Sequence, residues 1–245
     1  MKTKTLSIII PVYNEEQFVG SLLQKVYEVN LSKLGYTKQI IIINDGSKDK
    51  SEEIIQEFIN THTDYEIIYK YQERQADGSN SKGAALKHWF SLATGDLYII
   101  QDADLEYEPS DYISLIQKLE KYNLDFVYGS RTLGYFKFWA KYSTFGFLLG
   151  GLLLSTIVSI LGFTIVTDEP TCYKLYKSTL KDHLLRIKEN SFDREPAITM
   201  LLLKKGYRYG EVPIHYYPRT ITTGKKIKLM DGRDAIKTLF KYRFN

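Results

Sequence analysis

Short, continuously apolar runs alternate with helical periodicity along the first part of the chain. The runs at 6–10 and 40–43 are rich in isoleucine and are followed by turn-forming residues, a pattern typical of strands buried on both faces of a sheet. Apolar residues at helical spacing follow each run, from Phe18 to Val26 and within 49–60. Two β-α units in succession predict a parallel sheet with helices on both faces.

The alternation of strands and helices continues to about residue 130. We expect strands at 65–71, 98–101 and 124–128 and a polar loop at 72–82. Helices are expected at 83–93 and at 110–122, the second of which begins after Pro109. In open parallel sheets, ligands bind outside the carboxyl ends of the strands. Tyr13, Asp45, Asp102 and Asp104 all fall at such ends, so the sequence predicts a binding site at that edge.

Asp102 and Asp104 are the strongest candidates for metal ligands. Extended backbone places side chains at i and i+2 on the same side of a strand, so the two carboxylates should converge. Carboxylate oxygens suit Mg²⁺ or Mn²⁺, whose coordination is usually completed by substrate phosphates and water. Glu106 continues the spacing and would add a third oxygen. The alternative is that Asp-x-Asp only caps a strand or turn, but its place at the binding edge favours the metal site.

Composition and charge narrow the function classes. The 245 residues suffice for one domain with a full core. Residues 171–245 contain 17 Lys and Arg against 7 Asp and Glu, which suits phosphates, anionic lipid or nucleic acid. No base-stacking or groove-reading motif accompanies this charge, so we set a nucleic-acid binder aside. The chain also lacks the glycine-rich fingerprints of dehydrogenases and P-loop enzymes. Its single cysteine, Cys172, rules out an internal disulfide and fits a reducing compartment.

Nine short motifs run through almost the whole chain. They are PVYNEE (11–16), INDGSKD (43–49), ATGD (93–96), QDADLEYEP (101–109), YGSR (128–131), TDEPTCYKLYK (167–177), FDREP (192–196), EVPIHYYPR (211–219) and GKKI (224–227). In this order and spacing they resemble the family-2 glycosyltransferases of the GT-A fold, and more narrowly the dolichyl- and polyprenyl-phosphate mannose and glucose synthases. The resemblance implies a Rossmann-like α/β fold with a mostly parallel sheet flanked by helices, and membrane-interface helices after the core.

The resemblance also implies which residues bind the donor and the metal. The donor contacts would come from Pro11, Tyr13, Glu15, Asp45, Asp102 and Ala103. The ligands of Mg²⁺ or Mn²⁺ would be Asp102, Asp104 and Glu106, and the ion would neutralise the leaving diphosphate. For Tyr13 and Asp45, the alternative is a turn that only solvates a strand end.

Phosphate contacts and acceptor-side acids follow from the same resemblance. Arg131, Arg219 and Lys225 would bind phosphates, arginine through paired donors and lysine as a point charge. The catalytic set would be Asp104, Arg131, Asp168 and Glu195, with the last two on the acceptor side. Alternatively, Lys225 belongs to a solvated basic loop and Glu195 caps or pairs on a helix. The family often has an arginine four residues before a serine in the segment after GSR, where this chain has Trp139 before Ser143.

The segment 144–167 contains no charged residue and is long enough to span a membrane. A span would separate Asp168 from Asp102 and Asp104 across the bilayer and divide the site. We therefore expect interface helices over 136–167, flanked by aromatic and basic residues. The alternative is a buried core or oligomer helix. The chain would accordingly consist of a nucleotide-sugar-binding core at 1–135, the interface helices at 136–167, and an acceptor-side part of the same domain with a basic C-terminal helix at 168–245.

The function expected from this resemblance is metal-dependent, inverting transfer of a hexose. The donor would be a UDP- or GDP-linked sugar and the acceptor a polyprenyl phosphate, at the cytoplasmic face of the membrane, with the protein peripheral or monotopic. Transfer to a hydroxyl of a soluble glycan is the alternative, and it would need a carboxylate base such as Asp168 or Glu195. A non-catalytic nucleotide-binding or membrane-scaffold protein is the third possibility, and only the two enzymes would depend on Asp102 for turnover.

Overall fold

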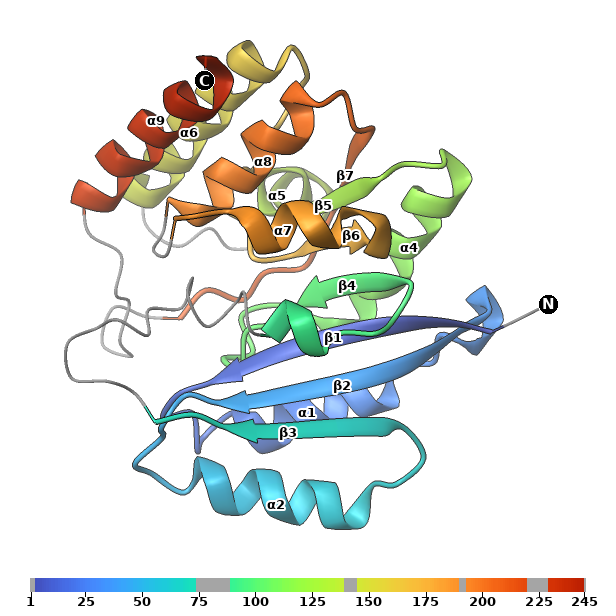
Figure 1. Cartoon of the computed structure of the whole chain (residues 1–245). Coiled ribbons are helices and arrows are strands. Elements are labelled where there is room, and N and C mark those ends of the chain that lie inside the picture. The colour runs from blue at the N-terminus through green and yellow to red at the C-terminus, as the bar shows by residue number, and fades with distance from the viewer. Residues whose placement is uncertain (1–2, 74–88, 139–144, 190–192, 220–228, 245) are drawn as a thin grey trace.

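The computed structural model describes residues 3–73, 89–138, 145–189, 193–219 and 229–244 (Figure 1). Within these residues, seven strands form one sheet in the order β3-β2-β1-β4-β6-β5-β7. The strands are β1 (Lys4–Val12), β2 (Tyr36–Asn44), β3 (Glu66–Tyr71), β4 (Leu97–Ile100), β5 (Phe126–Ser130), β6 (Lys174–Lys177) and β7 (Tyr209–Pro213). Only β6 runs antiparallel to its neighbours, so the predicted mostly parallel α/β sheet is confirmed.

Helices cover both faces of this sheet. They are α1 (Val19–Glu28), α2 (Ser51–Thr61), α4 (Tyr112–Lys121), α5 (Arg131–Phe138), α6 (Phe145–Gly162), α7 (Lys181–Arg186), α8 (Arg194–Lys204) and α9 (Leu229–Phe244), together with a helical segment at 89–92. Apolar residues of α1, α2 and α4 form the core against one face. The 89–92 segment, α7 and α8 pack against the other. The arrangement is therefore three layers, with the sheet between two layers of helices and β4 as its middle strand.

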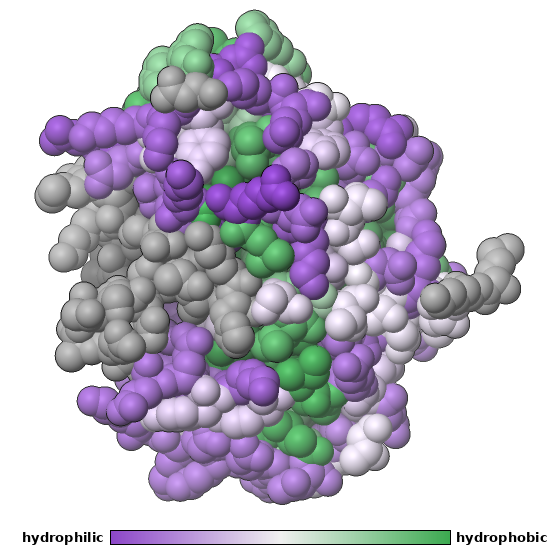
Figure 2. Space-filling model, in the orientation of Figure 1, coloured by the Kyte–Doolittle hydropathy of each residue, from purple (hydrophilic) through white to green (hydrophobic). Residues whose placement is uncertain are grey.

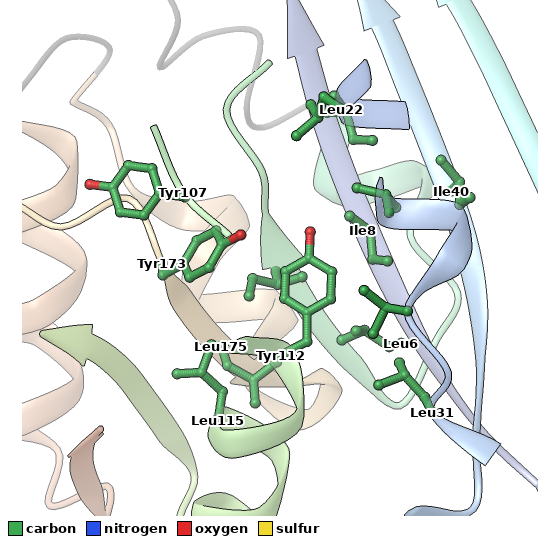
Figure 3. Packing of buried hydrophobic residues seen from close by; sticks show 14 of the residues in the cluster. Leu6, Ile8, Leu22, Leu31, Ile40, Tyr107, Tyr112, Leu115, Tyr173 and Leu175 are labelled. Atoms are coloured by element: carbon green, nitrogen blue, oxygen red, sulfur yellow. The ribbon is translucent and has the colours of Figure 1, made fainter. Parts of the chain in front are cut away.

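The core also fixes the end of β4, where the predicted metal ligands begin. Ile8 and Ile40 of neighbouring strands pack with Leu22 of α1 in the cluster shown in Figure 3. Gln101 directly follows β4 and is fully buried. Its side-chain oxygen accepts hydrogen bonds from the hydroxyls of both Tyr112 and Tyr173. The residue before Asp102 is thus held rigidly by the sheet and its aromatic neighbours.

The predicted interface region contains one long helix rather than a pair within 144–167. α6 runs without interruption from Phe145 to Gly162, although its sequence contains several glycines. Glycine is tolerated here because Gly162 packs closely on Leu203 of α8, while Val158 joins a small core with α8 and α9. In the part of the chain that the structure describes, no helix combines the length and hydropathy needed to cross a membrane.

Candidate active site

The loops after β1 and β2 are tied together by side-chain hydrogen bonds. Asn14 has a φ of 54°, a left-handed conformation that asparagine tolerates, and its amide donates to Ser47 Oγ at 3.0 Å. The amide of Glu15 donates to Ser51 Oγ at 2.9 Å. These bonds cross between the two loops, so the predicted donor-binding segments after β1 and β2 lie side by side.

Asp45 borders the same edge of the sheet at the end of β2. Its amide donates to the Val12 carbonyl at 2.8 Å, and its Oδ1 accepts from Gln72 Nε2 at 2.5 Å. Asp45 is almost fully buried, whereas Pro11 and Tyr13 are partly exposed. The structure thus brings Pro11, Tyr13 and Asp45 together, with two of them accessible from solvent.

Asp102 and Asp104 lie in a turn rather than in extended strand. β4 ends at Ile100, so the same-side placement expected from strand geometry does not apply. Ala103 between them is buried in the core, while both aspartates are partly exposed. The Glu106 amide donates to Asp104 Oδ1 at 3.1 Å and closes the turn. The two carboxylates are therefore presented next to the loops of β1 and β2 by a turn that the core anchors through Ala103.

Arg219 joins this group from the far end of the sequence. Its Nη2 donates to Glu15 Oε2 at 2.7 Å, its Nε donates to the Asp104 carbonyl at 3.2 Å, and Nε lies 3.7 Å from Asp104 Oδ2. Its guanidinium carbon also lies 4.5 Å from the ring centre of Phe18. The predicted phosphate arginine thus lies against both a predicted donor residue and a predicted metal ligand.

Glu106 is held by the same C-terminal segment instead of facing the aspartates. Its Oε1 accepts from the Arg219 amide at 2.7 Å and its Oε2 from the Tyr216 hydroxyl at 2.9 Å. Across the described residues, no three His, Cys, Asp or Glu side chains form a group that could hold a metal ion. Asp102 and Asp104 fit a site in which two carboxylates share the ion with a diphosphate. Each Glu106 oxygen accepts one of these hydrogen bonds and keeps a second lone pair, so Glu106 stays a predicted third ligand whose carboxylate is positioned by Tyr216 and Arg219.

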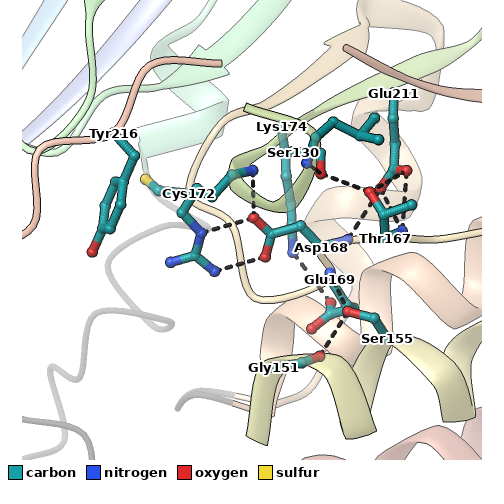
Figure 4. A network of polar contacts seen from close by, with 12 residues as sticks. Ser130, Gly151, Ser155, Thr167, Asp168, Glu169, Cys172, Lys174, Glu211 and Tyr216 are labelled. Atoms are coloured by element: carbon teal, nitrogen blue, oxygen red, sulfur yellow. Dashed lines mark hydrogen bonds and ion pairs between the residues drawn. The ribbon is translucent and has the colours of Figure 1, made fainter. Parts of the chain in front are cut away.

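Arg131 and Asp168 form a two-pronged ion pair (Figure 4). Nε and Nη2 of Arg131 donate to the two carboxylate oxygens at 2.8 and 2.7 Å, and the Arg131 amide adds a third bond at 2.7 Å. The side chain of Asp168 is 1% exposed and that of Arg131 15%. Arg131 also lies 5.2 Å from the ring centre of Tyr216, whose hydroxyl bonds Glu106. Tyr216 therefore connects the arginine pair to the turn after β4.

The segment before Asp168 is held by a buried carboxylate on β7. Glu211 accepts hydrogen bonds from the amides of Thr167 and Asp168 and from the Thr167 hydroxyl, at 2.8 to 3.3 Å. Tyr209 donates a further bond to it at 2.7 Å. Burial raises the pKa of the Glu211 carboxyl above its usual value, against the lowering effect of these donors. Glu211 thus sets the backbone from which Asp168 reaches Arg131.

Glu195 is paired with a lysine inside the protein. Lys174 is fully buried, and its Nζ lies 3.0 Å from Glu195 Oε2 and 3.2 Å from Glu169 Oε1. Burial alone would lower the pKa of Lys174, but the two carboxylates raise it well above its usual value. Burial raises the pKa of Glu169, whose Oε2 has no hydrogen-bond partner among the described residues. Glu195 remains 30% exposed, so it is the more accessible of the two predicted acceptor-side acids.

The predicted residues thus fall into two connected groups, and Tyr216 links them. Lys225, Trp139 and Ser143 lie outside the described residues. Sequence reasoning assigned no role to Tyr216 or Glu211, although both belong to the EVPIHYYPR motif. Their place in a motif that resembles the family could have marked them as candidates, but the motif alone does not say which residues they contact.

Comparison with known proteins identifies the family. The family model for glycosyl transferase family 2 matches residues 7–184. A dolichyl-phosphate beta-glucosyltransferase of Trichomonas vaginalis is 26% identical, over 98% of this chain and 74% of its own length. The UDP-N-acetylglucosamine–dolichyl-phosphate N-acetylglucosaminyltransferase of Methanococcus voltae is 28% identical, over 87% and 86%.

Solved structures share the fold at low identity. Glucosyl-3-phosphoglycerate synthase from Mycobacterium tuberculosis, in complex with Mn²⁺, UDP and glucosyl-3-phosphoglycerate, has a TM-score of 0.62 at 13% identity, covering 98% of this chain and 80% of that one. A mannosyltransferase from Pyrobaculum calidifontis, in complex with GDP-Man and Mn²⁺, has a TM-score of 0.59 at 15% identity, covering 97% and 69%. These likenesses show the GT-A fold, and the match over residues 7–184 shows the family: the chain is a glycosyltransferase and belongs to glycosyl transferase family 2.

Proposed function

We propose that this glycosyltransferase moves a hexose from a UDP- or GDP-linked sugar to a polyprenyl phosphate. The observation that carries this proposal is the pairing of Asp168 with Arg131, in which both carboxylate oxygens accept hydrogen bonds. An acid engaged in this way is poorly placed to remove a proton from a hydroxyl acceptor. Glu195, the other candidate base, is paired with the buried Lys174 at 3.0 Å. A phosphate oxygen is already an anionic nucleophile and needs no base. The two dolichyl-phosphate transferases that resemble most of the chain support the same acceptor class.

In the proposed reaction the acceptor phosphate displaces the nucleoside diphosphate in one step. One phosphate oxygen forms the new bond to the anomeric carbon while the bond to the donor diphosphate breaks, so the configuration inverts. Pro11, Tyr13, Glu15 and Asp45 hold the nucleoside side of the donor. Arg131, oriented by Asp168, and Arg219 at the turn after β4 stabilise phosphate charge as the bond breaks.

Asp102 and Asp104 would hold Mg²⁺ or Mn²⁺ together with the donor diphosphate. Such an ion neutralises charge on the leaving group. Two solved structures of the same fold contain Mn²⁺ with a nucleotide, which supports a divalent ion here. Arg219 lies 3.7 Å from Asp104 Oδ2, so its cation and the metal would share the same carboxylate, and Arg219 can turn to the diphosphate when the ion is present.

The test is transfer of label into a lipid. Purified protein is incubated with radiolabelled UDP-glucose or GDP-mannose, Mn²⁺ and a polyprenyl phosphate, with EDTA in a parallel reaction. We expect metal-dependent label in the organic phase with one donor, and loss of it in Asp102→Asn. Asp182→Asn, which changes an exposed aspartate on α7, is the matched control and should keep activity. Label found only in a soluble acceptor would overturn the proposed acceptor.

We further propose that α6 and the residues after it face a membrane surface. Leu149, Leu153 and Ile160 on α6 and Phe163 and Ile165 beyond it are 51 to 83% exposed. In Figure 2, apolar residues gather at the top of the view, where α6 and α9 end in Figure 1. Exposed apolar side chains clustered in this way are typical of interaction sites.

Vesicle sedimentation tests the membrane surface. Burying one leucine or isoleucine contributes about 1.5–3 kcal/mol, so Leu153→Glu with Ile160→Glu should weaken binding to phosphatidylglycerol vesicles by at least about tenfold. Tyr122→Glu replaces an apolar side chain of similar exposure, 53%, at the end of α4, and should bind as the wild type does. Equal binding by all three proteins would contradict this orientation.

A further inference from the structure

α6 presents two chemically different faces. Its exposed residues Leu149, Leu153 and Ile160 follow helical spacing and share one side. Ser155 lies on the opposite side and is 2% exposed, with Ser159 one turn further along the same side. A buried hydroxyl must find hydrogen-bond partners, and the partners of these two serines lie outside the helix as well as within it.

The two serines hold the backbone that follows the helix. Ser155 Oγ accepts from the Glu169 amide at 2.9 Å and donates to the Gly151 carbonyl at 2.8 Å. Ser159 Oγ accepts from the Val166 amide at 2.9 Å and donates to the Ser155 carbonyl at 2.7 Å. Each serine thus accepts a hydrogen bond from an amide of the 166–169 segment. The Ser155 hydroxyl donates within α6, whereas the Ser159 hydroxyl has two carbonyl acceptors, Ser155 in α6 at 2.7 Å and Val166 at 3.1 Å.

This segment carries the carboxylate that orients Arg131. Asp168 lies directly before Glu169, whose amide Ser155 binds, and its carboxylate accepts both prongs of Arg131. Glu211 fixes the segment from the side of β7. The backbone of 166–169 is therefore held between α6 and β7, as Figure 4 shows for Ser155 and Glu211.

We propose that Ser155 and Ser159 are positioning residues: through the 166–169 segment and Asp168 they fix the direction of Arg131. This inference rests on the proposed function for the part that Arg131 plays toward phosphates, but the geometric claim stands by itself. Removing either hydroxyl leaves a buried amide without its acceptor, so the segment shifts or takes up water, and Asp168 shifts with it. The helix that faces the membrane on one side thus supports the phosphate-binding arginine on the other.

The experiment compares Ser155→Ala and Ser159→Ala with Thr156→Ala. Thr156 is exposed on the same helix, and its hydroxyl donates only to the Leu152 carbonyl within α6. Arginine-selective ¹⁵N labelling reports on the Nε–H of Arg131, which donates to Asp168 at 2.8 Å, without donor or lipid present. We expect both serine variants to shift or broaden this resonance and to exchange its proton faster, and Thr156→Ala to leave it unchanged.

Kinetics provide the second readout, at a temperature where every variant is folded. A lost hydrogen bond of this kind should lower kcat about tenfold, while the KM for the donor changes less than threefold because the loops after β1 and β2 are untouched. Ser155→Thr, which keeps a hydroxyl, should restore the Arg131 resonance. An unchanged resonance in both serine variants would overturn the inference. If the serine variants show the resonance effect but the wild type transfers no sugar to lipid, the proposed function alone is overturned.

Discussion

The guanidinium of Arg131 and the carboxylate of Asp168 match each other atom for atom, with two parallel hydrogen bonds of 2.7 and 2.8 Å. Paired donors of this kind give geometric precision as well as energy. The pair leaves the Arg131 side chain 15% exposed. At this scale, we propose that Asp168 acts by directing Arg131 toward an anionic acceptor.

Replacing Asp168 by asparagine should separate orientation from proton removal. Asparagine keeps the shape but presents one acceptor and an amide that repels the guanidinium, so we expect kcat to fall about 10²–10³-fold, as for loss of a preorganised electrostatic contact. For a general base, the rate of the variant would rise with hydroxide concentration, so its loss relative to the wild type would shrink as pH rises. For an orienting residue, the loss stays the same at every pH. Initial rates of the Asp168→Asn variant from pH 6 to 9 distinguish the two, and recovery at high pH would contradict orientation.

Glu211 gives a pH-dependent contribution to stability whose sign follows from its raised pKa. Below the ordinary glutamate pKa, Glu211 is protonated in both the folded and unfolded chains. As pH rises, the unfolded chain ionises first, so stability falls until pH passes the raised pKa of the folded state. Each pKa unit corresponds to about 1.4 kcal/mol.

The corresponding measurement is urea unfolding of the wild type and Glu211→Gln between pH 4 and 8. The free energy of unfolding of the wild type, relative to the variant, should decrease as pH rises through this window. Glu16→Gln, which changes a glutamate in the loop after β1, serves as the control for general charge effects. A relative stability that increases with pH would show that the pKa of Glu211 is lowered by folding instead.

At the scale of elements, the sequence predicts strands best where burial is uniform along the strand. β1, β2 and β4 are apolar runs buried along nearly their whole length, and their order along the chain implies a parallel sheet. β6 was not predicted, because it begins and ends with lysine and lysine is not expected in a buried strand. Lys174 is tolerated there only because Glu169 and Glu195 approach it from β6's own preceding loop and from α8.

Alanine substitutions at two helix glycines should change the stability of the protein in opposite directions. A Cβ on Gly150 of α6 would meet nothing within 4 Å, whereas a Cβ on Gly134 of α5 would lie 2.0 Å from the Ile214 carbonyl oxygen. Gly150→Ala should therefore stabilise the protein by about 0.5–1 kcal/mol through helix propensity. Gly134→Ala should destabilise it by about 1–3 kcal/mol, because α5 must move away from the backbone after β7. Thermal unfolding of the two variants tests these expectations. Equal shifts of their midpoint temperatures would contradict the close packing of α5.

At the scale of the whole molecule, the site is assembled from both ends of the chain. Motif order supplied the candidate residues, but the ion pair between Glu15 and Arg219 joins residues that no local pattern connects. The contacts of Tyr216 with Arg131 and Glu106 are of the same kind. Periodicity determines which face of an element is buried, whereas the meeting of distant loops depends on how the sheet orders its strands. This explains why the candidate residues were predictable and their partners were not.

Arg219 lies where its charge would compete with a metal ion bound by Asp104. Its Nε is 3.7 Å from Asp104 Oδ2 and its Nη2 is 2.7 Å from Glu15 Oε2. Without nucleotide, Arg219→Gln should therefore bind Mn²⁺ about fivefold more tightly, since one unit charge at about 4 Å in a wet site is worth about 1 kcal/mol. With the donor bound, the same variant should turn over more slowly, because the diphosphate loses an arginine.

Electron paramagnetic resonance of free Mn²⁺ measures this affinity directly, and Arg208→Gln is the matched control. Arg208 is 53% exposed and pairs with Asp125 away from the site, so its loss removes the same charge from the molecule without touching Asp104. If both variants tighten Mn²⁺ binding equally, the effect is that of net charge and Arg219 has no special place. If only Arg219→Gln does so while losing turnover, then one arginine from the C-terminal part neutralises the metal site before the ion arrives and serves the diphosphate afterwards.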